Sequence, residues 1–172
     1  MPWKKLKKSY RGRPRGAVFK TRRKVTERHG LELKERLARK LLHAPIGSVY
    51  YDGHKITVNF DGQVLSNKVV VVQHEKWVGH WSRSEPLVYI DNDVPMEFRK
   101  YVAFHETIEK YLTERYGLNP DAEAHIIAEN VEHRYFTRRF GETEWKKYSD
   151  IVEIIHRREM AYHEKRQKFE RT

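Results

Sequence analysis

Two polar residues, His105 and Glu109, interrupt the apolar face of a predicted helix. Phe98, Val102 and Leu112 recur at helical spacing around them and predict an amphipathic helix that begins after residue 93 and ends near residue 116. Both polar side chains fall on the face that should be buried. Burying a carboxylate without a partner costs several kcal/mol. The fold must therefore bring a metal ion, another cation or a proton to this face.

A second set of acidic and histidine side chains follows about one helix later: His125, Glu129, Glu132 and His133. Asn119 suits the N-cap of this helix and Pro120 suits its first position. The short link at residues 117–119 predicts that the two helices are antiparallel neighbours. We therefore expect His105 and Glu109 to face His125 and Glu129.

The spacing of these residues predicts a metal site. Residues i and i+4 of a helix point the same way, so His105 and Glu109 can hold one ion together. A tetrahedral catalytic site needs a third protein ligand and leaves its fourth position to water. His125 is the best candidate for the third ligand, followed by Glu129 and then Asp121. Glu132 and His133 are candidates for further ligands or for groups that orient the ligands.

Glu106 stands next to the first ligand in the sequence, about 100° around the helix from it. From there its carboxylate can reach a water on the metal without ligating the ion itself, which is the position of a general base. Nitrogen and carboxylate ligands without sulfur are compatible with Zn²⁺, Mn²⁺ or Fe²⁺. Zn²⁺ is preferred because the pentapeptide His105–Glu109 differs from the H-E-x-x-H zinc motif only at its last residue.

Residues 86–136 resemble small zincin-like domains of the ImmA/IrrE type and short HExxE proteins of phages and mobile elements. In those domains a strand, a proline and an arginine-containing helical turn precede H-E-x-x-H, and the equivalents here are Leu87–Ile90, Pro95 and Arg99. Glu109 departs from the motif, which has histidine at that place. Their next helix carries an E-x-x-A-N-x-F-A segment, which aligns with residues 121–128.

The resemblance implies a zinc-dependent hydrolase, with a peptidase-like scaffold. It also implies a third ligand, which falls on Asp121 if the acidic ligand of the ImmA type carries over and on His125 if the phage-type pattern does. A structural interpretation stays open beside it. The same histidines and glutamates could form a buried ion-pair network between two helices, as in thermophilic proteins, whose charged fraction resembles the 34% found here.

The positive charge is concentrated at the N-terminus. Residues 1–40 contain 16 lysines and arginines against 3 acidic residues, whereas the rest of the chain is nearly neutral. We expect residues 1–25 to form a flexible basic arm that contacts a nucleic acid or an acidic partner. The alternative function is therefore that of a non-catalytic nucleic-acid-binding protein with a structural His/Glu network. The candidate phosphate contacts are Lys4, Lys5, Lys7, Lys8, Arg11, Arg13, Arg15, Arg22, Arg23 and Lys24.

The order of the elements predicts an α+β fold. Strands at 48–51, 54–60, 68–73 and 87–90, separated by Asp-Gly turns and by a loop or irregular hairpin at 74–81, predict a small and mainly antiparallel sheet. The antiparallel helix pair follows, and a long helix at 143–168 closes the chain. The predicted division is an arm at 1–25, a zincin-like domain at 26–141 and a C-terminal helix at 142–172 packed on that domain.

Three details of the strand region complete the prediction. The run Val69–Val72 suggests a strand buried on both faces. His74 and His80 in the following loop are weak candidates for metal ligands. Trp77 and Trp81 are expected to cover the sheet rather than to bind a ligand.

Cysteine is absent from the sequence, which excludes disulfides, thiolate metal sites and thiol nucleophiles within it. No apolar run approaches the roughly 20 residues of a membrane span, and the first residues lack the apolar stretch of a signal peptide. We therefore expect no membrane partner and a cytoplasmic location.

Overall fold

The structure is a computed structural model that describes residues 34–170. The predicted basic arm at residues 1–25, with all ten of its candidate phosphate contacts, lies outside the described residues. The chain divides into two compact units, one at residues 1–37 and the other at residues 38–172. A helix spans residues 34–42 at this division. The sheet and the long helices all belong to the second unit.

The second unit contains a five-stranded sheet with the order β1-β2-β3-β5-β4. Neighbouring strands are antiparallel except for β3 and β5, which run parallel. The α+β class with a mainly antiparallel sheet is thus confirmed. The strands are β1 (Ile46–Tyr51), β2 (Lys55–Phe60), β3 (Gln63–Val72), β4 (Gly79–Trp81) and β5 (Leu87–Asp91).

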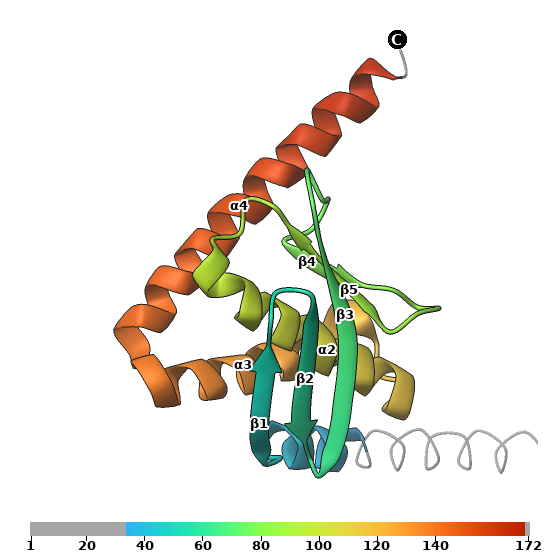
Figure 1. Cartoon of the computed structure of the whole chain (residues 1–172). Coiled ribbons are helices and arrows are strands. Elements are labelled where there is room, and N and C mark those ends of the chain that lie inside the picture. The colour runs from blue at the N-terminus through green and yellow to red at the C-terminus, as the bar shows by residue number, and fades with distance from the viewer. Residues whose placement is uncertain (1–33, 171–172) are drawn as a thin grey trace, which may run out of the picture. The chain divides into compact units, whose positions relative to one another are not determined.

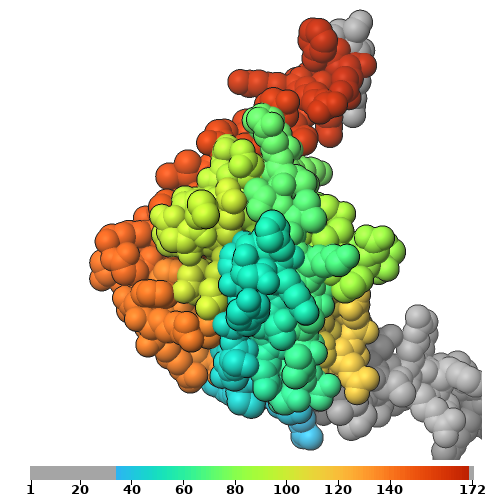
Figure 2. All heavy atoms as spheres, in the orientation of Figure 1, coloured from blue at the N-terminus to red at the C-terminus, as the bar shows by residue number. Residues whose placement is uncertain are grey.

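One face of the sheet carries the core and the other is open. Ile56, Val58 and Phe60 alternate along β2 and are completely buried, as the period of two predicts. The prediction that Val69–Val72 is buried on both faces is wrong, because Val70 is 40% exposed whereas Val69 is 4% exposed. Helices cover only the inner face of β3, so alternate valines remain on the open side. In Figure 2 the side chains of β1, β2 and β3 (cyan to green) form this open surface.

Strand β4 lies within the segment predicted as a loop or irregular hairpin. It pairs with β5 and forms the edge of the sheet, with His80 opposite Tyr89. Its three residues contain a glycine and a histidine, which is too short and too polar a run to predict a strand. Trp77, before β4, is 42% exposed and stacks on His156 at 5.4 Å between ring centroids.

The helices follow the sheet in the chain and cover its inner face. Figure 1 shows α2 crossing behind the strands, with α3 beside it. Phe104, Ile108 and Leu112 of α2 are fully buried and form the centre of the core. Gly117, with φ of 64°, ends α2 in the left-handed conformation that glycine adopts at low cost. The elements are α2 (Met96–Tyr116), the π-helical turn η1 (Pro120–Ala124), α3 (His125–Phe140) and α4 (Glu142–Phe169).

Aromatic contacts hold α4 on the body. Tyr148 is buried and stacks on Phe136 of α3 at 5.1 Å between ring centroids, and it also contacts Phe98 of α2 at 5.2 Å. The start of the long C-terminal helix is therefore part of the core. Among the helices of residues 34–170, none is long and apolar enough to cross a membrane.

Candidate metal centre

Three side chains from α2 and α3 converge at one point. His105 and Glu109 lie one turn apart on α2, and His125 is the first residue of α3. One ligand atom from each of the three lies within 4.8 Å of the others. The structure thus brings together the three residues that the sequence predicts as first-choice ligands. We call this group the candidate centre.

The distances within the candidate centre fit hydrogen bonds and are also compatible with a small metal site. His105 Nε2 lies 3.1 Å from His125 Nδ1 and 3.4 Å from Glu109 Oε2. His125 Nδ1 lies 2.9 Å from the same carboxylate oxygen. Ligands about 2.0–2.1 Å from a tetrahedral metal are separated by roughly 3.3 Å. The triangle is therefore close to the size that one small cation requires.

A local distortion of the backbone positions His125. The Asn119 side chain accepts a hydrogen bond from the Asp121 N–H at 2.8 Å, and Pro120 occupies the first position of the turn. The Ala124 N–H then bonds the Asn119 carbonyl at 2.9 Å, which closes a π-helical turn before α3 begins. This extra residue in the turn sets the phase in which α3 presents His125 to α2.

Glu132 fixes the orientation of the His105 ring. Its Oε2 lies 3.0 Å from His105 Nδ1, and its other oxygen accepts a hydrogen bond from the Tyr148 hydroxyl of α4. Glu132 is only 4% exposed. A carboxylate on one imidazole nitrogen sets the tautomer that leaves the opposite nitrogen free to ligate a metal. This arrangement is the one that metal-binding histidines usually have.

Trp81 orients the carboxylate of Glu109 in the same way. Its indole N–H donates a hydrogen bond of 2.9 Å to Glu109 Oε1, which leaves Oε2 directed at the two histidines. Lys110 lies over the Trp81 ring at 5.1 Å and donates a hydrogen bond to the Ser82 carbonyl, which holds this end of β4 against α2. The expectation that Trp81 only covers the sheet misses this role.

Glu106 is buried beside the candidate centre, between α2 and β4. A Cβ atom on Gly79 would stand 2.9 Å from Glu106 Oε1 and 2.6 Å from Val102 Cγ1. Only glycine at this position lets the strand approach the carboxyl so closely. Burial raises the pKa of Glu106 to about 8, with the charge of His105 opposing and those of Glu109 and Glu132 adding to the rise.

The titration of the candidate centre reflects its close contacts. Burial alone would lower the pKa of His105, but hydrogen bonds to Glu109 and Glu132 outweigh burial and raise it well above its usual range. Burial alone would raise the pKa of Glu109, but the hydrogen bonds to His105, His125 and Trp81 lower it to about 2. A proton on His105 can therefore neutralise the group, as the structural interpretation requires. A metal cation would serve the same electrostatic purpose.

The candidate centre is exposed to solvent mainly at His125. The side chains of His105 and Glu109 are each 11% exposed, whereas that of His125 is 53% exposed. Solvent therefore reaches the centre mainly past His125.

The other predicted site residues lie outside the candidate centre. Asp121 and Glu129 are exposed and contribute no atom to it. His133 lies 2.9 Å from the Glu142 carboxylate at the start of α4. His74 lies 3.3 Å from Glu159 and His80 stacks on Tyr89, so neither histidine reaches the centre. The expectation that Glu129 faces His105 is corrected, since Glu132 occupies that place.

Comparison of the chain with protein-family models, with curated proteins and with solved structures finds no match. The functional interpretation therefore rests on the geometry of the candidate centre.

The sequence offered little sign of Tyr148 and Gly79, which complete the site. Tyr148 is one of ten tyrosines, and it lies beyond the helix pair in the sequence. Gly79 precedes a histidine and a tryptophan in a segment without a clear period. Trp81 lies a few residues before the predicted strand at 87–90 in the sequence. This position alone does not predict that Trp81 contacts Glu109.

Proposed function

We propose that the chain is a metal-dependent hydrolase with a zincin-like arrangement, in which His105, Glu109 and His125 hold one metal ion. The main support for the proposal is the triangle of ligand atoms, with sides of 2.9, 3.1 and 3.4 Å, whose ion pairs within residues 34–170 include no lysine or arginine. The carboxylate of Glu132 behind His105 supports it further. Zn²⁺ is the preferred ion, with Mn²⁺ and Fe²⁺ also suited to two nitrogens and a carboxylate.

The metal would act as a Lewis acid on a substrate carbonyl and on water at the open side of the centre. Glu106 would take a proton from that water and return it to the leaving group, because the charge of a bound metal would lower the pKa that burial raises in its absence. Its carboxyl is one residue from a ligand and buried, which suits a general base that must not ligate the ion itself. Trp81, Glu132 and Tyr148 hold the ligands in place.

Metal analysis of the full-length protein, purified without added metal, tests the first half of the proposal. We expect about one equivalent of metal in the wild type and none in His105→Ala/Glu109→Ala. The matched control is His133→Asn, which removes a histidine outside the centre and should retain the metal. A wild type that carries no stoichiometric metal and takes up none from Zn²⁺, Mn²⁺ or Fe²⁺ would refute the metal centre.

Hydrolysis of fluorescently labelled casein tests the second half. Glu106→Gln should keep the metal but lower the rate by about 10²–10⁴-fold, the usual contribution of a general base. A metal-loaded wild type that cleaves no faster than Glu106→Gln would refute Glu106 as the base and leave a structural metal.

A further inference from the structure

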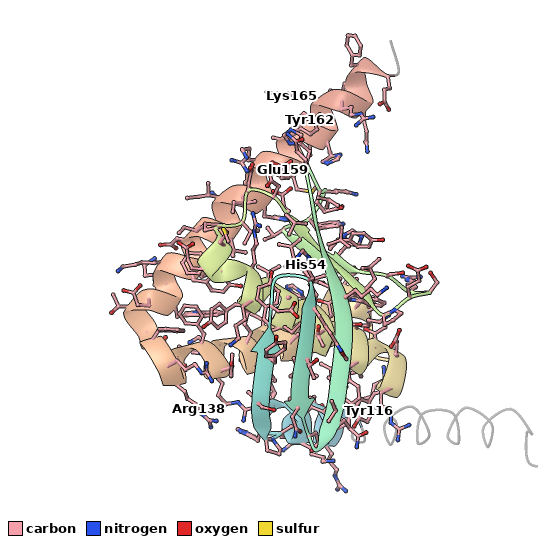
Figure 3. The ribbon with its side chains drawn as sticks, viewed as in Figure 1. His54, Tyr116, Arg138, Glu159, Tyr162 and Lys165 are labelled. Carbon is pink, nitrogen blue, oxygen red and sulfur yellow. The ribbon has the colours of Figure 1, made fainter. Side chains whose placement is uncertain are left out.

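Two pairs of like charges lie on α2 and α3: Arg134 with Arg138, and Arg139 with Lys100. Arg134, Arg138 and Arg139 belong to α3 and Lys100 belongs to α2. We call them the cationic face. Within residues 34–170, none of them forms an ion pair with a carboxylate, and Arg134 instead donates a hydrogen bond of 2.6 Å to the Ala44 carbonyl. Figure 3 labels Arg138 near the end of α3.

The cations of this face repel one another. Lys100 Nζ and Arg139 Cζ lie 5.9 and 4.8 Å from the centroid of the same ring, that of Tyr135. Burial and the charge of Arg139 lower the pKa of Lys100, and burial and the charge of Arg138 lower that of Arg134. Like charges one helical turn apart destabilise a helix. This repulsion destabilises the free protein, and a bound anion would reduce it.

Two buried donors of α3 lack acceptors among the described residues. The Tyr135 hydroxyl and the Arg134 Nε are buried, and neither has a hydrogen-bond partner among the described residues. Burial raises the pKa of both Tyr135 and Tyr101 against the opposing charge of Arg139, so both phenols stay protonated. The donors within reach of an oxyanion such as phosphate are therefore the exposed guanidinium groups of Arg138 and Arg139, which have no carboxylate partner within residues 34–170.

The highly charged composition does not account for the face by itself, because the cations of α4 are mostly paired. Lys146 contacts Asp150 at 3.0 Å, Lys147 contacts Glu144 at 2.5 Å and Arg157 contacts Glu153. The dipole of α3 favours cations in its last turn, which explains Arg138 and Arg139 in part. It does not explain Lys100, which lies in the first half of α2.

We propose that the cationic face binds the phosphodiester backbone of a nucleic acid. Arginine is suited to this role because its planar guanidinium bonds two phosphate oxygens at once. Phe140 is 51% exposed and its ring lies 6.0 Å from that of Tyr101, so an aromatic surface is available at the edge of the face for an unpaired base. The proposal is independent of the metal centre.

Fluorescence anisotropy of the full-length protein with a labelled single strand of 20 nucleotides and a duplex of 20 base pairs tests the proposal. The test variant is Lys100→Gln/Arg139→Gln. The matched control, Lys146→Gln/Arg157→Gln, removes the same charge from paired positions of α4. Measurements from 50 to 300 mM NaCl contain EDTA, so that loss of a metal affects every variant equally. Thermal unfolding of each variant verifies that it is folded. A second test variant, Arg138→Gln/Arg139→Gln, changes only two exposed residues.

Each phosphate contact on duplex DNA contributes about 0.9 to the slope of log affinity against log salt. The test variant should therefore lose about 1.8 from the slope and bind roughly a hundredfold more weakly at 0.1 M salt, whereas the control should keep the wild-type slope. Equal losses in test and control variants would overturn the proposal, because only net charge would then matter. If the test variant loses as much binding to polyglutamate as to DNA, the proposal is overturned in favour of an acidic protein as the partner. Saturable binding of inorganic phosphate without binding of either oligonucleotide would reduce the face to a small-anion site.

Discussion

Residues 34–170 contain two clusters in which three potential metal ligands lie within 4.8 Å of one another: the candidate centre of His105, Glu109 and His125, and a carboxylate cluster of Asp91, Asp93 and Glu159. The two clusters are alike in the closeness of their ligand atoms. They differ in the charged side chains around them. The carboxylate cluster contacts an arginine, whereas the ion pairs of the candidate centre include no lysine or arginine of residues 34–170.

The carboxylate cluster already has its cation. Arg158 bonds Asp93 and lies 3.2 Å from Glu159, while His74 lies 3.3 Å from the other oxygen of Glu159. Asp91 is completely buried, and it accepts hydrogen bonds from backbone N–H groups at 2.7 and 2.8 Å. These contacts join α4 to the end of β5 (Figure 3 labels Glu159), so the cluster is a structural clamp.

The candidate centre has no such partner within residues 34–170. Its ion pairs join histidines to carboxylates, and no lysine or arginine takes part in them. The positive charge must come from a proton on a histidine or from a metal. Close ligand atoms are thus a weak sign of a metal site by themselves, and the surrounding charges decide between the two explanations.

Metal removal should give the largest difference between the clusters. An ion present at a thousand times its dissociation constant stabilises the fold by about 4 kcal/mol. Excess EDTA should therefore lower the melting temperature of the wild type by roughly 10 °C for a chain of this length, as measured by circular dichroism. Glu109→Gln should show no further drop with EDTA, whereas Asp93→Asn should respond like the wild type. If the melting temperature of the wild type does not change with EDTA, the candidate centre holds no stabilising metal and does not differ from the carboxylate cluster in this respect.

Replacing Glu132 should weaken the candidate centre without removing a ligand. Glu132→Gln keeps the size of the side chain and a partner for Tyr148, but it removes the charge behind His105. Groups in this position usually contribute 10–100-fold to metal affinity, and we expect a loss of that size in calorimetric titrations with Zn²⁺. The neighbouring change His133→Asn is the control, with an affinity close to that of the wild type. If both variants bind equally well, Glu132 holds the helices together rather than the ligand.

Much of the fold could be predicted from short-range patterns. The Asp-Gly turns, the alternation of Ile56, Val58 and Phe60, and the capping residues Asn119 and Pro120 each determine local geometry, and the structure has the elements they predict. Strand β4 could not be predicted because it is held by pairing with β5, a contact that its own residues do not encode.

The candidate centre divides in the same way. His105 and Glu109 were predictable because a helix fixes their spacing, and His125 because the link between the helices is short. The place of Glu132 was ambiguous, since the π-helical turn shifts the phase of α3 by an amount that the sequence does not reveal. Trp81 and Tyr148 come from β4 and α4, whose approach to α2 depends on the packing of the whole domain.

The carboxylate cluster should respond to the loss of its own cation. Arg158→Gln leaves Glu159, which is 1% exposed, without its arginine. Removing one partner of a buried pair costs about 3–5 kcal/mol, but the Arg158 side chain is 52% exposed, so we expect only about 1–2 kcal/mol in urea unfolding. The loss should be the same with and without EDTA. A loss that appears only without the chelator would mean that metal ions occupy this cluster as well.

The pH dependence of the carboxylate cluster should give the smallest effect. Burial raises the pKa of Asp91, and the charges of Glu159 and Asp93 add to the rise against the hydrogen bonds from the N–H groups of Asp93 and Glu75. A group whose pKa is higher in the folded state stabilises the fold fully below its unfolded pKa, which for aspartate is about 3.9, and this stabilisation is lost as the pH rises through the folded value.

Asp91→Asn lacks this titration, so the difference between the two proteins isolates it. We expect the free energy of unfolding of the wild type, relative to Asp91→Asn, to fall as the pH rises from about 4 and then to level off. Urea unfolding at intervals of half a pH unit would measure the difference, and any hydrogen bond lost in the variant only adds a constant offset. A relative stability that rises with pH would mean that Asp91 has a lowered pKa, as a carboxylate bound to a cation has, and the contrast between the two clusters would disappear.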